Sequence, residues 1–104
     1  SQQTQDRANA SAIPAGAALV EFGSGASVKT RILLDAAPHV AVYAPIDISA
    51  SALEAAAQAI GRDYPKVEVA PLRDDFTNAL ALPEAAAGRP IVGFGNVRLL
   101  NTST

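Results

Sequence analysis

Short apolar runs recur along this chain, and longer segments with a helical period separate them. The first run, residues 17–22, is apolar except for Glu21, which is typical of a parallel strand buried on both faces. The second run contains Pro45, which cannot donate a hydrogen bond to a neighbouring strand and therefore weakens the strand pattern. Together the runs predict four strands, at residues 17–22, 41–46, 67–72 and 91–94.

A helix is predicted between the first two strands. Apolar residues recur at helical spacing from Val28 to Ala37, Ser24 or Ser27 can cap the start, and Pro38 ends the pattern. A buried strand, a turn of small residues and a helix, in that order, are typical of the first half of a βαβ unit.

Further helices are predicted elsewhere in the chain. Between the second and third strands, Ser51 and Glu54 form a capping-box pattern, and Gly61 closes the helical run. Residues 1–13 are expected to hold the end of a preceding helix, and residues 83–87 a short helix before the last strand.

The alternation of strands and helices predicts the fold class. Right-handed crossovers favour a parallel sheet, with its four strands ordered 3-2-1-4. We therefore expect a single, incomplete α/β domain with a Rossmann-like sheet over residues 1–104, ending in a divergent tail at residues 97–104. In such sheets, ligands bind at the carboxyl ends of the strands.

Composition mainly excludes functions. Ten acidic against eight basic residues give a net charge of −2 without a clustered basic face, so we expect neither nucleic acid nor a membrane surface as a partner. Cysteine is absent, which excludes disulfides and thiolate chemistry, and we expect no metal site. The polar N-terminus and the lack of a run of about 20 apolar residues predict a cytoplasmic location.

Candidate binding residues follow three of the predicted strands. Gly23 and Gly25 come after the first strand, Asp47 ends the second, and Asp75 and Phe76 follow the third. Each has a structural explanation of its own: a tight turn, a helix cap, an acidic turn with a core aromatic. The topology brings these strand ends together, so we predict one cleft for a nucleoside, with Asp47 accepting the ribose hydroxyls.

The glycine-rich turn narrows the choice of ligand. Residues 23–30 nearly match the phosphate-binding pattern G-x-x-x-x-G-K-[ST], but Val28 stands where the second glycine belongs. The dinucleotide pattern G-x-G-x-x-G fails at the same residue. A ligand with ribose and adenine but no phosphate remains, and S-adenosylmethionine is the common one. A phosphate-loop nucleotide hydrolase and, less favoured, a dehydrogenase stay open as alternatives.

Three segments carry a family resemblance. Residues 19–35 contain G-S-G-x-S-x-K-T, residues 43–49 contain P-[IV]-D-[IV]-S, and residues 75–77 are Asp-Phe-Thr. In this combination the chain closely resembles the S-adenosylmethionine-dependent histidine-specific methyltransferases, which make trimethylhistidine for ergothioneine. The resemblance implies a class I methyltransferase sheet, S-adenosylmethionine as cofactor, and histidine or a related amino acid as substrate.

The resemblance also implies roles for individual residues. Gly23 would lie against the methionine part of the cofactor, and Lys29, otherwise an ordinary exposed helix charge, would hold its carboxylate. Asp47 would bind the ribose, and Asp75 with Phe76 the adenine. Asn96 would correspond to the family's substrate-contacting asparagine, although the segment around it is shorter here than in the family.

No catalytic residue is predicted. His39 follows Pro38 in a turn and is expected at the surface, while Tyr43 and Tyr64 are expected to pack. Family members are longer and supply their substrate contacts from regions without a counterpart here. We therefore expect the cofactor-binding part of such an enzyme, either active or binding without turnover. An apolar edge at the fourth strand would favour self-association, or a chain that is not stably folded.

Overall fold

The computed structural model describes residues 1–23, 28–74 and 82–95. In chain order its elements are α1 (Gln2–Ser11), β1 (Ala18–Phe22), α2 (Val28–Ala36), β2 (Val42–Asp47), α3 (Ala50–Asp63), β3 (Glu68–Val69), β4 (Leu72–Arg73), the 3-10 helix η1 (Glu84–Ala86) and β5 (Ile91–Gly95). The predicted helices and strands are all present, with one strand divided in two.

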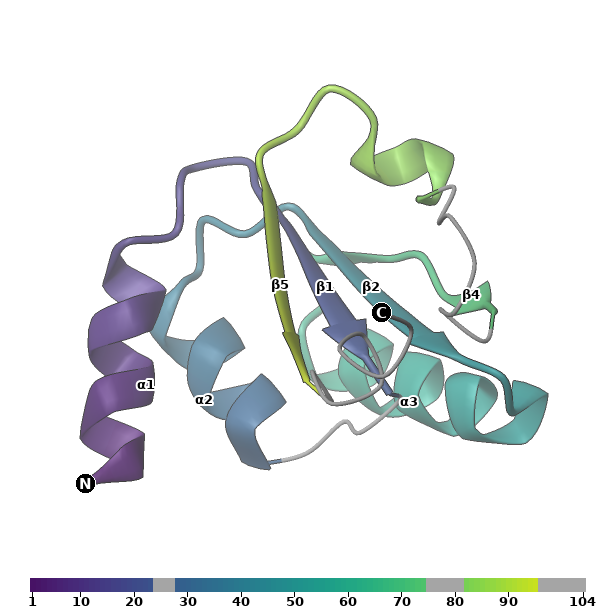
Figure 1. Cartoon of the computed structure of the whole chain (residues 1–104), viewed down its shortest axis with the longest axis horizontal. Helices are drawn as coiled ribbons and strands as arrows, with labels where there is room; N and C mark the ends of the chain where they lie inside the picture. Colours follow the sequence, from purple (N-terminus) through teal and green to yellow (C-terminus); the bar gives the residue numbers. More distant parts are fainter. Residues whose placement is uncertain (24–27, 75–81, 96–104) are drawn as a thin grey trace, which may run out of the picture.

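Every strand pairing in the described sheet is parallel. The order is β3-β2-β1-β5, and β4 pairs with β2 beyond the end of β3. This is the predicted order 3-2-1-4, because β5 is the fourth strand of the sequence analysis. The arrowheads of β1, β2 and β5 point the same way in Figure 1, so their carboxyl ends share one edge of the sheet. The Rossmann-like prediction is confirmed.

The third predicted strand is split, and Pro45 explains the interruption. On β2, the carbonyl oxygens of Ala41, Tyr43 and Asp47 accept from the N–H groups of Glu68, Ala70 and Asp74 respectively. Pro45 lies between Tyr43 and Asp47 in this alternating set and has no N–H to donate to the facing chain. The ladder therefore breaks between β3 and β4 and resumes at Leu72.

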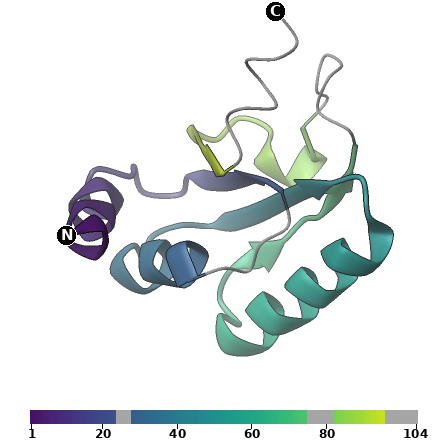
Figure 2. The same ribbon diagram turned by 60° about the horizontal axis from the view of Figure 1, so that its bottom comes forward.

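The helices cover one face of the sheet. Leu19 of β1 and Tyr43 of β2 are fully buried in an apolar cluster with Ala10 of α1, Leu33 of α2 and Ile60 of α3. The opposite face is covered by η1, whose Ala86 packs on Ala18 and Val42. Figure 2 shows α2 and α3 on one side of the strands and η1 on the other.

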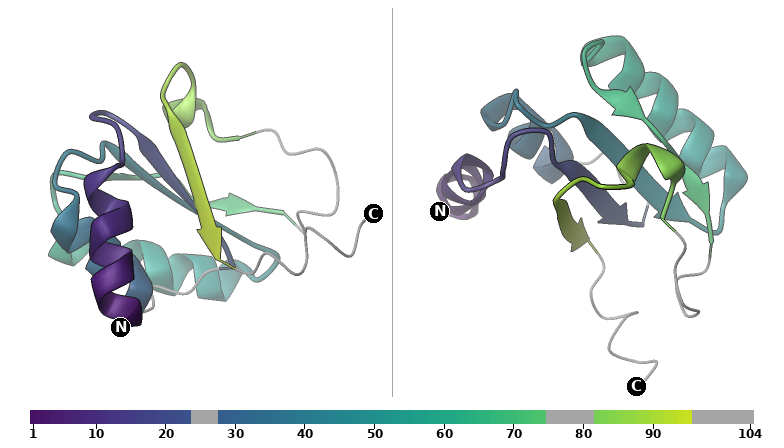
Figure 3. Two further views of the ribbon diagram at one scale, coloured as in Figure 1. Left: turned by 60° about the vertical axis from the view of Figure 1, so that its left-hand side comes forward. Right: turned by 90° about the horizontal axis from the view of Figure 1, so that it is seen from above.

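The ends of the molecule along the sheet differ. Figure 3 shows α1 at one end and α3 at the other. Within the described residues β5 pairs only with β1, and Ile91 on it is 45% exposed. Self-association through this edge stays a prediction. In the part of the chain that the structure describes, no helix is long and apolar enough to cross a membrane.

The start of α3 differs from the sequence prediction. Its N-cap is Ser49, whose hydroxyl accepts from the N–H of Ala52 at 3.2 Å, and not Ser51. Gly61 does not end the helix either, since α3 continues to Asp63 and its C-cap is Tyr64. The capping-box prediction was wrong because Asp47 turns the chain two residues earlier than the pattern suggests, by accepting from the N–H of Ser49.

We predict different changes in stability when each of the two serines is replaced. Ser49→Ala removes the capping hydroxyl and should lower the free energy of unfolding by about 1 kcal/mol. Ser51→Ala changes an exposed residue inside the helix and should alter it by less than about 0.5 kcal/mol. Urea denaturation of both variants measures the difference. An equal loss for the two would contradict the assignment of Ser49 as the cap.

Candidate functional site

Gly23 directly follows the carboxyl end of β1. Its φ is +96°, a conformation that favours glycine. Its N–H donates to the carbonyl oxygen of Ile46 at 2.8 Å, which joins the ends of β1 and β2. Apart from the chain neighbours of Gly23, no heavy atom of the described residues lies within 4 Å of the place where a Cβ would stand. Among the described residues, the backbone at Gly23 is therefore open on this side.

Asp47 ends the neighbouring strand and is half-buried. Its Oδ1 accepts from the N–H of Ser49 at 2.9 Å, and its carbonyl oxygen accepts from the N–H of Asp74. The carboxylate is thus held by the turn that begins α3, as the helix-cap explanation expected. A carboxylate has about four lone-pair directions, so one cap bond does not by itself conflict with a binding role. The cap and a binding role are compatible.

Lys29 lies in the first turn of α2, and its surroundings were not predicted. Its Nζ lies 3.9 Å from Oδ1 of Asp6 on α1 and 6.0 Å from the ring centre of Phe94 on β5. The Lys29 side chain is 46% exposed, whereas that of Asp6 is only 3% exposed. The ammonium group is therefore held near the carboxyl end of β5 and remains open to solvent on one side.

The structure places two of the predicted site residues at neighbouring strand ends and the third beside another strand. Gly23 follows β1 and Asp47 ends β2, and these two strands are paired up to their carboxyl ends. Lys29 lies in the first turn of α2, near Phe94 of β5. The predicted adenine contacts, Asp75 and Phe76, lie outside the described residues, as do Asn96 and Gly25.

A buried polar network near this edge was missed by the sequence analysis. Glu21 is 5% exposed, and its Oε1 accepts from the hydroxyl of Thr30 at 2.8 Å and from that of Tyr43 at 2.5 Å. Thr30 and Tyr43 are themselves fully buried. One sequence signal could have found it, because Glu21 is the single charged residue in an otherwise apolar buried strand.

The histidine and the tyrosines have structural contacts. Tyr43 and Tyr64 pack against the core, as expected. His39 lies in the predicted turn but is half-buried, not simply at the surface, since its Nε2–H donates to the carbonyl oxygen of Ile13 at 2.6 Å. The exposed-turn prediction failed because the chain linking α1 to β1 folds back over this turn, where Gly16 donates to the His39 carbonyl.

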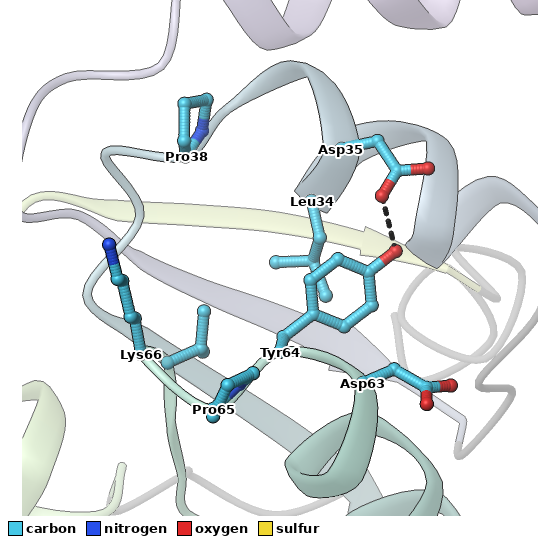
Figure 4. Close-up of a pocket in the computed structure, with 8 residues that line it drawn as sticks. Leu34, Asp35, Pro38, Asp63, Tyr64, Pro65 and Lys66 are labelled. Carbon is cyan, nitrogen blue, oxygen red and sulfur yellow. Dashed lines mark hydrogen bonds between the residues drawn. The ribbon is translucent and has the colours of Figure 1, made fainter.

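A cavity lies away from the carboxyl edge of the sheet. A cavity of about 320 Å³ opens between the C-terminal ends of α2 and α3, lined by Leu34, Asp35, Pro38, Asp63, Tyr64, Pro65, Lys66 and Val67. Figure 4 shows the Tyr64 hydroxyl pointing at Asp35, to which it donates at 2.5 Å. Hydrogen bonds from Arg62 and Arg31 hold the pKa of Asp63 at about 2. The predicted site residues do not line this cavity, so we do not assign it to the cofactor.

No metal centre is formed within the described ranges. No group of three or more histidine, aspartate or glutamate side chains there is arranged to hold a metal ion. The candidate site is therefore built on backbone groups, carboxylates and one ammonium group.

Comparison with solved structures defines the class of protein. The fold matches the crystal structure of the 23S rRNA methyltransferase ErmE over 98% of this chain and 39% of the other, with a TM-score of 0.59 and 19% sequence identity. At that identity the likeness shows the fold alone. The chain has the Rossmann-like fold of class I methyltransferases.

The family follows from the sequence. The family described as histidine-specific, S-adenosylmethionine-dependent methyltransferases matches residues 2–102. Because the match covers nearly the whole chain, the chain belongs to this family. The resemblance of the sequence motifs is confirmed, and the nucleotide hydrolase and dehydrogenase alternatives are set aside.

Two curated relatives carry the same name, histidine N-alpha-methyltransferase. The protein of Mycobacterium tuberculosis (strain CDC 1551 / Oshkosh) is 48% identical over 65 residues, which cover 60% of this chain and 20% of the relative. That of Mycolicibacterium smegmatis is 40% identical over 81 residues, covering 75% of this chain and 25% of the relative. The matched part of this chain spans about a fifth to a quarter of the relatives' length.

Proposed function

We propose that this chain binds S-adenosylmethionine at the carboxyl ends of β1 and β2, as the cofactor-binding part of a histidine Nα-methyltransferase. The observation that supports it most is the open space beside Gly23, next to the carboxylate of Asp47 on the adjoining strand. The family description supports S-adenosylmethionine as the ligand and histidine as the substrate. We propose the α-amine of histidine as the methyl acceptor, on the way to trimethylhistidine and ergothioneine.

The described residues fit this cofactor in two respects. A Cβ at Gly23 would stand in the open space, so glycine there lets the backbone approach a ligand closely. Asp47 offers charged acceptor oxygens of the kind that bind a pair of ribose hydroxyls. Lys29 is proposed to hold the carboxylate of the methionine part, and Asp75 with Phe76 to contact the adenine. Asn96 is proposed as a contact to the substrate.

The proposed reaction sets the tasks of the protein. Bound S-adenosylmethionine supplies an activated methyl group, and the amine that receives it must be unprotonated and in line with the bond that breaks. Holding the cofactor in one orientation is the part of that task which Gly23, Lys29 and Asp47 can perform. We assign no catalytic residue to the described part of the chain, and propose cofactor binding as its contribution.

The role of Lys29 predicts a difference between two ligands. S-adenosylhomocysteine carries the amino acid carboxylate, whereas 5′-methylthioadenosine lacks it. Lys29→Met should therefore weaken S-adenosylhomocysteine about fivefold, as expected for a charge contact that is half open to solvent, and leave 5′-methylthioadenosine unchanged. Isothermal titration calorimetry with both ligands measures the two affinities.

Lys66→Met is the matched control, because Lys66 is exposed beside the cavity at the other end of α2. It should leave both affinities unchanged. If Lys29→Met weakens both ligands alike, or neither, Lys29 does not hold the carboxylate. In that case its ion pair with Asp6 would account for its position, as a link between α1 and α2.

A further inference from the structure

The buried network of Glu21, Thr30 and Tyr43 joins the three elements that carry the described candidate site residues. Glu21 on β1 lies two positions before Gly23, Thr30 follows Lys29 on α2, and Tyr43 lies on β2, the strand that ends at Asp47. Both hydroxyls donate to one oxygen of Glu21. A single carboxylate oxygen of Glu21 thus connects β1, α2 and β2.

Stability alone is a poor explanation for this carboxylate. Burying a carboxylate carries a desolvation cost, and its hydrogen bonds only offset that cost. An apolar side chain of similar size would avoid that cost, because Tyr43, to which Glu21 is bonded, belongs to the apolar cluster that contains Leu19 and Leu33. What hydrogen bonds add beyond apolar packing is direction, since they favour one arrangement of the three elements over slightly shifted ones.

Hydrogen bonds hold the chain on both sides of the turn after β1. On one side, Gly23 is held by its N–H bond to the carbonyl oxygen of Ile46. On the other, the Thr30 hydroxyl ties the first turn of α2 to Glu21. The Tyr43 hydroxyl fixes β2 to the same carboxylate of Glu21.

We infer that Glu21 is a positioning residue for cofactor binding, acting through Thr30 and Tyr43. It sets the relative placement of Gly23, Lys29 and Asp47 without contacting the ligand. This inference rests on the proposed function. It predicts that removing one hydroxyl from the network weakens cofactor binding by more than the accompanying loss of stability explains.

Thr30→Val tests the inference, because it keeps the shape of the side chain and removes the donor. We expect S-adenosylhomocysteine to bind about tenfold more weakly, the size expected for loss of one hydrogen bond to a charged group. Thr30→Ser restores the hydroxyl and should bind within about twofold of the parent chain. Tyr43→Phe, which removes the other donor, should weaken binding in the same direction. Calorimetric titration of the full chain measures all of these.

The matched control is Ile60→Val, a change at a fully buried residue of α3 in the same apolar cluster. It should lower the Tm by roughly 4 to 8 °C and leave affinity unchanged. A second readout needs no ligand. Amide hydrogen exchange at Gly23, divided by that at Glu68, which bonds to the distant start of β2, should rise in Thr30→Val and not in Ile60→Val.

The outcomes distinguish the positioning role of Glu21 from the proposed function of the chain. If the parent chain binds S-adenosylhomocysteine and Thr30→Val binds it equally well, with the Gly23 to Glu68 exchange ratio unchanged, the positioning role is overturned and the proposed function stands. If Thr30→Ser is as weak as Thr30→Val, the hydroxyl is not responsible and the inference fails. If the parent chain does not bind S-adenosylhomocysteine, the proposed function is contradicted and the positioning role falls with it.

Discussion

Gly95→Ala should destabilise the chain more than any other single methyl addition considered for it. Gly95 has a φ of +117°, which an L side chain rarely adopts, and it lies opposite Phe22 in the β1–β5 pairing. A Cβ there would clash with the carbonyl oxygen of Phe22 and stand 2.9 Å from its nitrogen. These are backbone atoms of a buried strand, so they cannot move aside as the end of a flexible side chain can.

The expected loss is at least about 3 kcal/mol in the free energy of unfolding, because backbone strain and a backbone clash add. For a domain of this size that corresponds to a fall in Tm of roughly 12 °C or more. Thermal unfolding followed by circular dichroism measures it. The function would suffer indirectly, since the carboxyl ends of β1 and β5 carry Gly23 and Phe94.

Gly61→Ala is the control and has the opposite sign. Gly61 lies within α3, and apart from its chain neighbours and the nearby backbone of α3 no heavy atom of the described residues is within 4 Å of its Cβ position. Alanine there should raise stability by about 0.5 to 1 kcal/mol, because glycine loses more backbone freedom than alanine in a helix. Equal effects at Gly95 and Gly61 would show that the close approach of β5 to β1 is wrongly described.

Asp47→Asn should weaken binding of S-adenosylhomocysteine by about 10- to 100-fold. A hydrogen bond to a charged acceptor contributes about 1.5 to 3 kcal/mol more than none, and the ribose hydroxyls are proposed to donate to this carboxylate. The asparagine keeps an oxygen that can accept from the N–H of Ser49, so the turn into α3 should persist. Affinity therefore falls while the Tm changes little, and calorimetry with thermal unfolding measures both.

Asp35→Asn provides the matched control. Asp35 lies near the far end of α2, where it accepts from the hydroxyl of Tyr64, and an amide oxygen can accept that bond too. This variant makes the same change of charge away from the site and should bind S-adenosylhomocysteine like the parent chain. If both variants lose affinity equally, the cause is net charge and Asp47 is not a direct contact.

The sheet order could be predicted from the sequence because its signals are local. Continuous apolar runs such as residues 17–22 mark buried parallel strands, and the handedness of crossovers leaves few ways to order them. The division of the third strand depends on Pro45, which lies on the neighbouring strand β2. A pairing between residues distant in sequence cannot be predicted from each apolar run alone.

The same difference between local signals and long-range contacts explains which features of the site could be predicted. The positions of Gly23 and Asp47 could be predicted, because Gly23 follows the first strand and Asp47 ends the second, and the topology places strand ends together. The network around Glu21 and the contact of Asp6 with Lys29 were missed, since each joins side chains from separate elements. The capping-box pattern indicated Ser51 and not Ser49 as the N-cap of α3, because that pattern does not include the turn that Asp47 forms.

Titration of the parent chain with S-adenosylhomocysteine, followed by magnesium-ATP in a separate run, tests cofactor binding most directly. The open backbone at Gly23 and the carboxylate of Asp47 predict saturable binding of one S-adenosylhomocysteine per chain and no saturable binding of ATP. Saturable ATP binding with no heat from S-adenosylhomocysteine would contradict the proposed site. Silence toward both ligands would show that this chain keeps the fold of its family without binding the cofactor.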